Sequence, residues 1–202
     1  LALWGVVRRT LAAPVLAARF AAHANGIALT AALLWALHPL QTESVVCIAQ
    51  RTESLCGLFF LFTLYAFIRG TTHPRWLVVS VAACLLGMGT KEVMVTAPVL
   101  VLLYDRTFVA GTFFAAVRRR GKFYAALAAT WLLLACLIWG GGGARGASAG
   151  FGLGVTWWTY LLKQSDALVQ YLLLSCWPHP LVLDYGTDVV STLGAVWWQG
   201  AG

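Results

Sequence analysis

Almost the whole chain consists of apolar runs that are separated by short polar breaks. Hydrophobic residues make up 60% of it, charged residues make up 10%, and its mean hydropathy is +0.80. Soluble domains rarely have such a composition. A lipid environment offers the backbone no hydrogen-bonding partner, so apolar runs that cross it must be helical. We therefore predict an all-α fold, a multipass transmembrane helical bundle.

The polar breaks divide the chain into six predicted membrane spans. Proline and basic residues mark most of their ends, because proline lacks an amide donor and disfavours a helix before it. Residues 11–25 are predicted to connect two helices near the lipid headgroups, and whether 157–177 crosses the membrane stays open. Leu1 lies inside an apolar run, so we expect the chain to be a fragment of a longer protein. The predicted spans cover about residues 21–37, 55–68, 76–89, 93–104, 123–139 and 157–177, and residues 1–7 form the tail of an earlier helix.

The stretch from His38 to Glu53 is unusually polar for such a chain. Its sixteen positions contain two carboxylates, an arginine, a histidine and two amides. Ionisable groups in a membrane protein are costly and often mark functional sites. A single helix would place Glu43 and Arg51 two turns apart on one side. A carboxylate that accepts a hydroxyl proton and a cation that neutralises a phosphate would suit glycosyl transfer from a lipid phosphate. A structural ion-pair network is the alternative.

The segment from Trp76 to Tyr104 is either one long helix or two short helices with a turn at Lys91 and Glu92. The turn would place ten basic residues on one side of the membrane and three on the other, with Lys163 undecided. A continuous helix would remove this asymmetry. Basic residues accumulate on the cytoplasmic side, so we favour the turn. The ten are Arg8, Arg9, Arg19, Arg69, Arg75, Arg106, Arg118, Arg119, Arg120 and Lys122, and the three are Arg51, Lys91 and Arg145.

Two short helical arms would place this turn near or beneath the external surface. We attribute the turn to Gly87 and Gly89, because glycine tolerates backbone conformations that other residues avoid. An ionised pair at that depth needs a partner or water. We therefore predict that Lys91 and Glu92 face a cavity that also contains Glu43 and Arg51. Asp105 and Arg106, by contrast, are interpreted as a topological stop at the end of a span.

Charge and cysteine content exclude several other classes of site. The net charge of +7 comes from basic residues at the ends of apolar runs, so we expect no nucleic-acid partner. Five cysteines without a Cys-x-x-Cys spacing predict neither a zinc site nor a disulfide framework. The glycines at 150, 152 and 154 lack the strand that precedes a nucleotide-binding loop, and we interpret them as a linker.

Three motifs occur in a fixed order along the chain: HPLQTESVVCIAQRTESLCGLFFLFTLYAFIRG, LLGMGTKEVMVTAPVLVLLYDRTF and WPHPLVLDYG. Together they resemble the membrane domain of the transmembrane-and-tetratricopeptide-repeat O-mannosyltransferase family and its bacterial relatives. These proteins are similar to the C-type glycosyltransferase superfamily. The resemblance covers most of the chain from about residue 27 to residue 186.

The resemblance implies a membrane glycosyltransferase. It would transfer a sugar, mannose by analogy, from a polyprenyl-phosphate donor to protein hydroxyls on the external or lumenal face. The implied partners are the lipid-linked donor, a protein acceptor and membrane lipids. We assign no cofactor and no metal ligands within this chain, and the sequence leaves any metal requirement open. The implied catalytic residues are Glu43, Glu53 and Glu92, and the implied substrate-binding residues are His38, Arg51, Lys91 and Asp184.

The chain departs from the family pattern in two respects. The acidic pair of the first external loop would precede Leu1, and no tetratricopeptide array follows the membrane segments. We expect both outside this fragment, which should be inactive alone. The sequence of the first motif is more similar to the bacterial members of the family, which favours a bacterial cytoplasmic membrane over the endoplasmic reticulum. A transporter or lipid-handling protein, for which inverted repeats would be expected, and a non-catalytic anchor for a repeat domain are the alternative functions.

Overall fold

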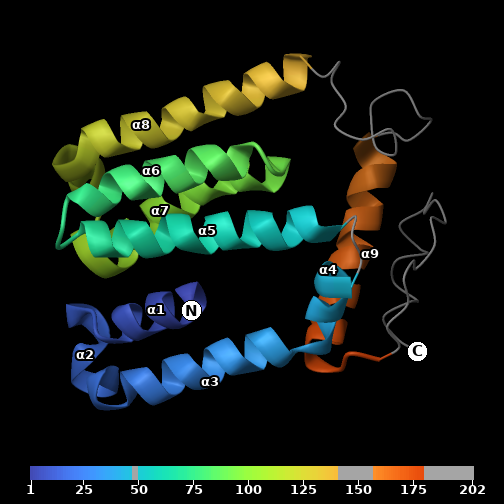
Figure 1. Cartoon of the computed structure of the whole chain (residues 1–202), viewed down its shortest axis with the longest axis horizontal. Coiled ribbons are helices and arrows are strands. Elements are labelled where there is room, and N and C mark those ends of the chain that lie inside the picture. The colour runs from blue at the N-terminus through green and yellow to red at the C-terminus, as the bar shows by residue number, and fades with distance from the viewer. Residues whose placement is uncertain (47–49, 141–156, 180–202) are drawn as a thin grey trace. The chain divides into compact units, whose positions relative to one another are not determined.

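A computed structural model describes residues 1–46, 50–140 and 157–179 (Figure 1). Every regular element within these ranges is a helix, and they contain no strand. The chain divides into two compact units, residues 1–140 and 141–202, which are described separately. In the second unit, the described element is α9 (Trp157–Cys176).

The first unit is a bundle of antiparallel helices joined by short turns. Figure 1 shows α5, α6 and α7 side by side, with α8 next to α6 and with α1 between α5 and α3. Its longer helices are α1 (Ala2–Leu11), α3 (Ala24–Leu37), α5 (Arg51–Gly70), α6 (Arg75–Met88), α7 (Ala97–Asp105) and α8 (Phe113–Gly140). The shorter elements are α2 (Pro14–Phe20), η1 (Ala21–His23), η2 (Pro39–Gln41), α4 (Thr42–Val46), η4 (Glu92–Thr96) and the π-helical η5 (Arg106–Ala110).

Four helical segments are long and apolar enough to cross a membrane, by length and composition. They agree with the predicted all-α membrane bundle. The helix α6 is apolar but has only 14 residues, so it covers about 21 Å at 1.5 Å per residue. The four segments are Pro14–Leu37, Arg51–Gly70, Glu92–Ala110 and Phe113–Leu137.

Several helix boundaries differ from those expected. Residues 14–23, predicted to be a connection, are helical, and Pro14 begins α2, where its missing amide hydrogen costs nothing. The first turn of α5 includes Arg51 and Glu53, four residues before the predicted start. The helix α8 starts at Phe113 rather than near residue 123 and is bent at Arg120, whose φ of −130° and ψ of 33° are not helical. Gly111, with φ of 80°, makes the turn before it.

The turn between α6 and α7 is present, so the single long helix is excluded. The helix α6 ends at Met88 and η4 begins at Glu92. Glycine conformational freedom is not the reason, however, because Gly89 has an ordinary φ of −73°. Gly87 instead allows close packing, since an added Cβ would lie 2.7 Å from the sulfur of the fully buried Met94. Our explanation of this turn was therefore wrong, although the turn itself was predicted.

Aromatic and sulfur-containing side chains fill the centre of the part of the bundle formed by α5, α6, α7 and α8. Phe67, Met88 and Met94 are fully buried. The Phe67 ring stacks on Phe123 of α8, with 5.5 Å between centroids, and meets Tyr104 of α7 edge-on at 6.3 Å. These contacts join α5, α7 and α8 around one apolar centre. Among the described residues, one ion pair lies on each side of this apolar centre, toward the two ends of the bundle.

Candidate functional site

An ion pair between Lys91 and Glu53 joins the two polar motifs at one end of the bundle. Glu53 lies in the first turn of α5, and Lys91 is the residue before η4. The side chains remain 35% and 39% exposed for Lys91 and Glu53 respectively, so water or a ligand can reach both. The antiparallel order of α5, α6 and η4 brings the start of α5 next to the end of α6, and this arrangement positions the pair.

The other described site residues lie before or after Glu53 and Lys91 in the sequence. The Arg51 side chain is exposed two positions before Glu53, and Glu92 is half-buried directly after Lys91. His38 is half-buried at the end of α3, where its Nδ1 accepts a hydrogen bond of 3.3 Å from the Leu40 amide. This contact caps η2, which is one structural role for the histidine.

Glu43 and Arg51 do not lie on one helix, contrary to the expectation from their spacing. The helix α4 ends at Val46 and α5 begins at Arg51. Ser54 connects the two helices, because its hydroxyl donates a hydrogen bond of 3.2 Å to the Ser44 carbonyl. The backbone of Glu43 therefore lies near the start of α5. Its side chain is outside the described residues, as is the whole of Asp184, so their places in the site stay predictions.

A groove of about 350 Å³ runs along the end of α3, close to the polar loop in sequence. It is mostly apolar, and it includes neither Arg51 nor Lys91. The predicted cavity shared by Lys91, Glu92, Glu43 and Arg51 is therefore not this groove. The groove is lined by Thr30, Leu33, Leu34, Leu37, His38 and Pro39.

A second ion pair lies at the opposite end of the bundle. The Asp105 carboxylate is fully buried and accepts two hydrogen bonds from Arg120 Nη1, at 2.8 and 2.9 Å. The Tyr124 hydroxyl donates a third, at 2.6 Å. Asp105 is the last residue of α7, as expected for the end of a span, but the sequence interpretation did not include its buried partners. The four-residue spacing of Arg120 and Tyr124, which places both on one helix face, was the available sequence signal.

The two pairs are suited to different tasks. Asp105 is enclosed by its three hydrogen bonds and can hold α7 against α8, but it has no open side for a substrate. Lys91 and Glu53 are half-exposed, and the exposed Arg51 lies in the same first turn of α5 as Glu53, so this end of the bundle presents two cations that a ligand can reach. Within the described ranges, no group of three or more His, Cys, Asp and Glu side chains is arranged to hold a metal ion.

Comparison of the chain with protein-family models, curated proteins and solved structures gave no match.

Proposed function

We propose that this chain is the membrane core of a glycosyltransferase that uses a polyprenyl-phosphate sugar and acts on protein hydroxyls. The observation that carries the proposal is the ion pair between Lys91 and Glu53. It joins, at one end of apolar helices, two segments that resemble the polar motifs of the O-mannosyltransferase family. The exposed Arg51 adds a second cation in the same turn of α5.

The proposed reaction needs two groups of opposite charge. The acceptor hydroxyl attacks C1 of the sugar, the bond from C1 to the phosphate oxygen breaks, and polyprenyl phosphate leaves with the electron pair. A cation stabilises the leaving phosphate, and a carboxylate takes the hydroxyl proton. We assign the phosphate to Lys91 and Arg51. A guanidinium suits this role, because its donors match phosphate oxygens.

The ion pair suggests a different role for Glu53 than direct proton transfer. Because Glu53 contacts Lys91, we assign it to positioning the ammonium group. Glu92 follows Lys91 directly and is half-buried, so we assign it as proton acceptor, with Glu43 as the alternative. The test is made on the whole protein in a membrane.

Transfer of labelled mannose from polyprenyl phosphate to an acceptor protein, with the enzyme in lipid vesicles, tests the proposal. Lys91→Met should lower transfer by 10²-fold or more, as is typical when a preorganised charge is removed. Glu53→Gln should raise the apparent KM for the donor more than it lowers kcat. Arg75→Met, which removes an exposed cation from the other end, is the matched control and should keep full activity. Failure of the wild-type protein to transfer any polyprenyl-linked sugar would contradict the proposal.

A further inference from the structure

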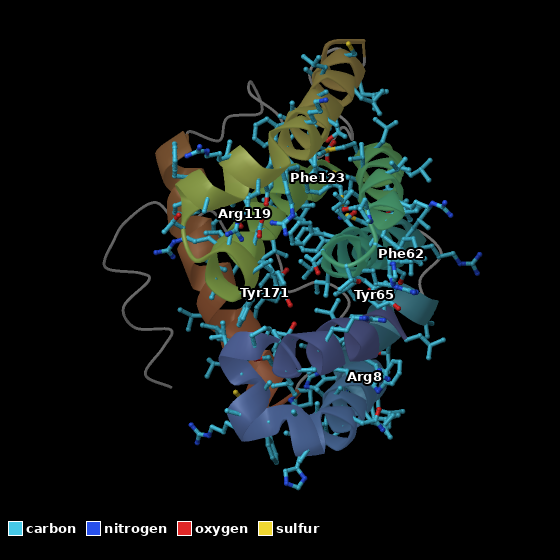
Figure 2. All side chains as sticks on the ribbon, turned by 90° about the vertical axis from the view of Figure 1, so that its left-hand side faces the viewer. Arg8, Phe62, Tyr65, Arg119, Phe123 and Tyr171 are labelled. Atoms are coloured by element: carbon cyan, nitrogen blue, oxygen red, sulfur yellow. The ribbon has the colours of Figure 1, made fainter. Side chains whose placement is uncertain are left out.

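The first turns of α8 form a separate amphipathic segment at the basic end of the bundle. Residues 113–119 precede the bend at Arg120. The segment begins at a capped turn, in which the Thr112 hydroxyl accepts a hydrogen bond of 3.1 Å from the Ala115 amide. Gly111 lets the chain reverse before it. Figure 2 looks onto this end of the bundle, with Arg8 and Arg119 labelled on different helices.

Large apolar side chains of this segment remain substantially exposed in the described bundle. Phe114 is 74% exposed, and Phe113 and Val117 are 45% and 47% exposed. Amphipathic helical segments with Phe on one side and Arg on the other lie at the depth where lipid headgroups meet acyl chains. An apolar environment around this segment would therefore be supplied by lipid.

Arginines lie directly beside these aromatic rings. The Arg106 guanidinium is 4.9 Å from the Phe113 ring centroid, and that of Arg118 is 6.0 Å from the Phe114 centroid. Arg119 is also exposed, and all three lack a carboxylate partner among the described residues. The acid nearest in the sequence, Asp105, is buried against Arg120. The segment thus presents uncompensated positive charge around an apolar wedge.

We propose that residues 106–119 form a binding site for anionic phospholipid headgroups in the leaflet at the basic end. The guanidinium groups of Arg106, Arg118 and Arg119 bind the phosphates, while Phe113 and Phe114 insert between the acyl chains. The Asp105–Arg120 pair holds the bend that directs the segment along the membrane surface. The positive-inside rule places this end at the cytoplasmic leaflet, where anionic lipids give a negative surface potential.

Binding of fluorescently labelled phosphatidylglycerol and phosphatidylcholine with identical acyl chains, measured on purified protein in detergent, tests the site. The wild type should bind phosphatidylglycerol more tightly. The preference is the Kd for phosphatidylcholine divided by the Kd for phosphatidylglycerol. In the triple variant Arg106→Gln, Arg118→Gln and Arg119→Gln, this ratio should fall by up to about fivefold per arginine. The control variant Arg8→Gln, Arg19→Gln and Arg75→Gln removes equal charge from the same end and should change the ratio less than twofold.

Two further arms separate this lipid site from simpler explanations. Phe114→Ala should weaken binding of both lipids by a similar factor, leaving their Kd ratio intact. Inorganic phosphate should displace labelled phosphatidylglycerol only at far higher concentration than unlabelled phosphatidylglycerol does. If both triple variants lost the preference equally, the lipid would be attracted by the overall positive charge of this end of the bundle, and the proposed local site would be wrong. A wild type without preference, or displacement by free phosphate at lipid-like concentration, would also overturn it, provided that circular dichroism shows folded variants.

Discussion

At the scale of single residues, Asp105 shows how a charge is accommodated inside an apolar bundle. Its carboxylate is fully buried, yet Arg120 and Tyr124 supply three hydrogen bonds, and the Arg120 guanidinium lies 5.7 Å from the Phe67 ring centroid. A buried pair of this kind contributes little net stability compared with apolar residues, but removing one partner leaves an uncompensated charge. Asp105 therefore adds little stability relative to an apolar residue, but removing it alone would destabilise the bundle strongly.

Asp105→Asn should lower the free energy of unfolding by about 3 kcal/mol, because Arg120 then keeps its charge with only 16% of its side chain exposed. Tyr124→Phe removes one hydrogen bond to a charged group and should cost about 2 kcal/mol. The double variant Asp105→Asn with Arg120→Met should recover much of the loss. Denaturant titration in detergent measures these differences, with the exposed Thr107→Val as control. A double variant less stable than either single variant would contradict this account.

At the scale of helices, the hairpin of α5 and α6 depends on close contact of small and polar residues. The Ser80 hydroxyl donates a hydrogen bond of 2.8 Å to the Thr63 carbonyl, and both residues are fully buried. Apolar side chains gain little by leaving lipid for a neighbouring helix, so packing and interhelical hydrogen bonds stabilise such contacts. Ser80 therefore connects two helices that their apolar surfaces alone would hold weakly.

Ser80→Ala should destabilise the bundle by about 1 kcal/mol, the range measured for hydrogen bonds between membrane helices. The hydroxyl of Thr96 bonds only within its own helical turn and is exposed, so Thr96→Val serves as the control and should change stability by less than about 0.5 kcal/mol. Unfolding in a denaturing detergent, followed by circular dichroism, gives both values. Equal effects of the two changes would mean that the interhelical bond adds nothing.

The helical class and the turn before Lys91 could be predicted because composition and charge distribution act over whole segments. The ends of the helices were harder to predict. Arg51 and the basic residues at 118–122 lie outside the predicted spans, yet arginine and lysine are good helix formers: Arg51 begins α5, and α8 extends through 118–122 with a bend at Arg120. The partners of Asp105 lie 15 and 19 residues away, and Lys91 meets Glu53 rather than a neighbour. Such pairings depend on how helices pack, which periodicity does not specify.

At the scale of residues 1–140, charge is distributed unevenly along the helix axes. The ends of α1, α2 and α5, the π-helical η5 and the starts of α6 and α8 carry ten basic residues, and the acid described there, Asp105, is neutralised by Arg120. The opposite end contains Arg51 and Lys91 together with three glutamates. Because cations are retained on the cytoplasmic side, we predict from this asymmetry that the end with Lys91 and Glu53 is external.

Single cysteines in a chain without its five native cysteines test this orientation. Thr90→Cys, in the turn beside Lys91, should react with an impermeant thiol reagent added outside intact cells. Thr72→Cys and Thr112→Cys lie at the basic end and should react only after permeabilisation. Thr72 and Thr112 are exposed and Thr90 is half-buried, so lack of access within the fold does not explain a protected residue at the basic end. Labelling of Thr112→Cys from outside would show that the bundle has the opposite orientation. The ion pair of Lys91 and Glu53 would then face the cytoplasm, and the external site on which the proposed transfer depends would not exist.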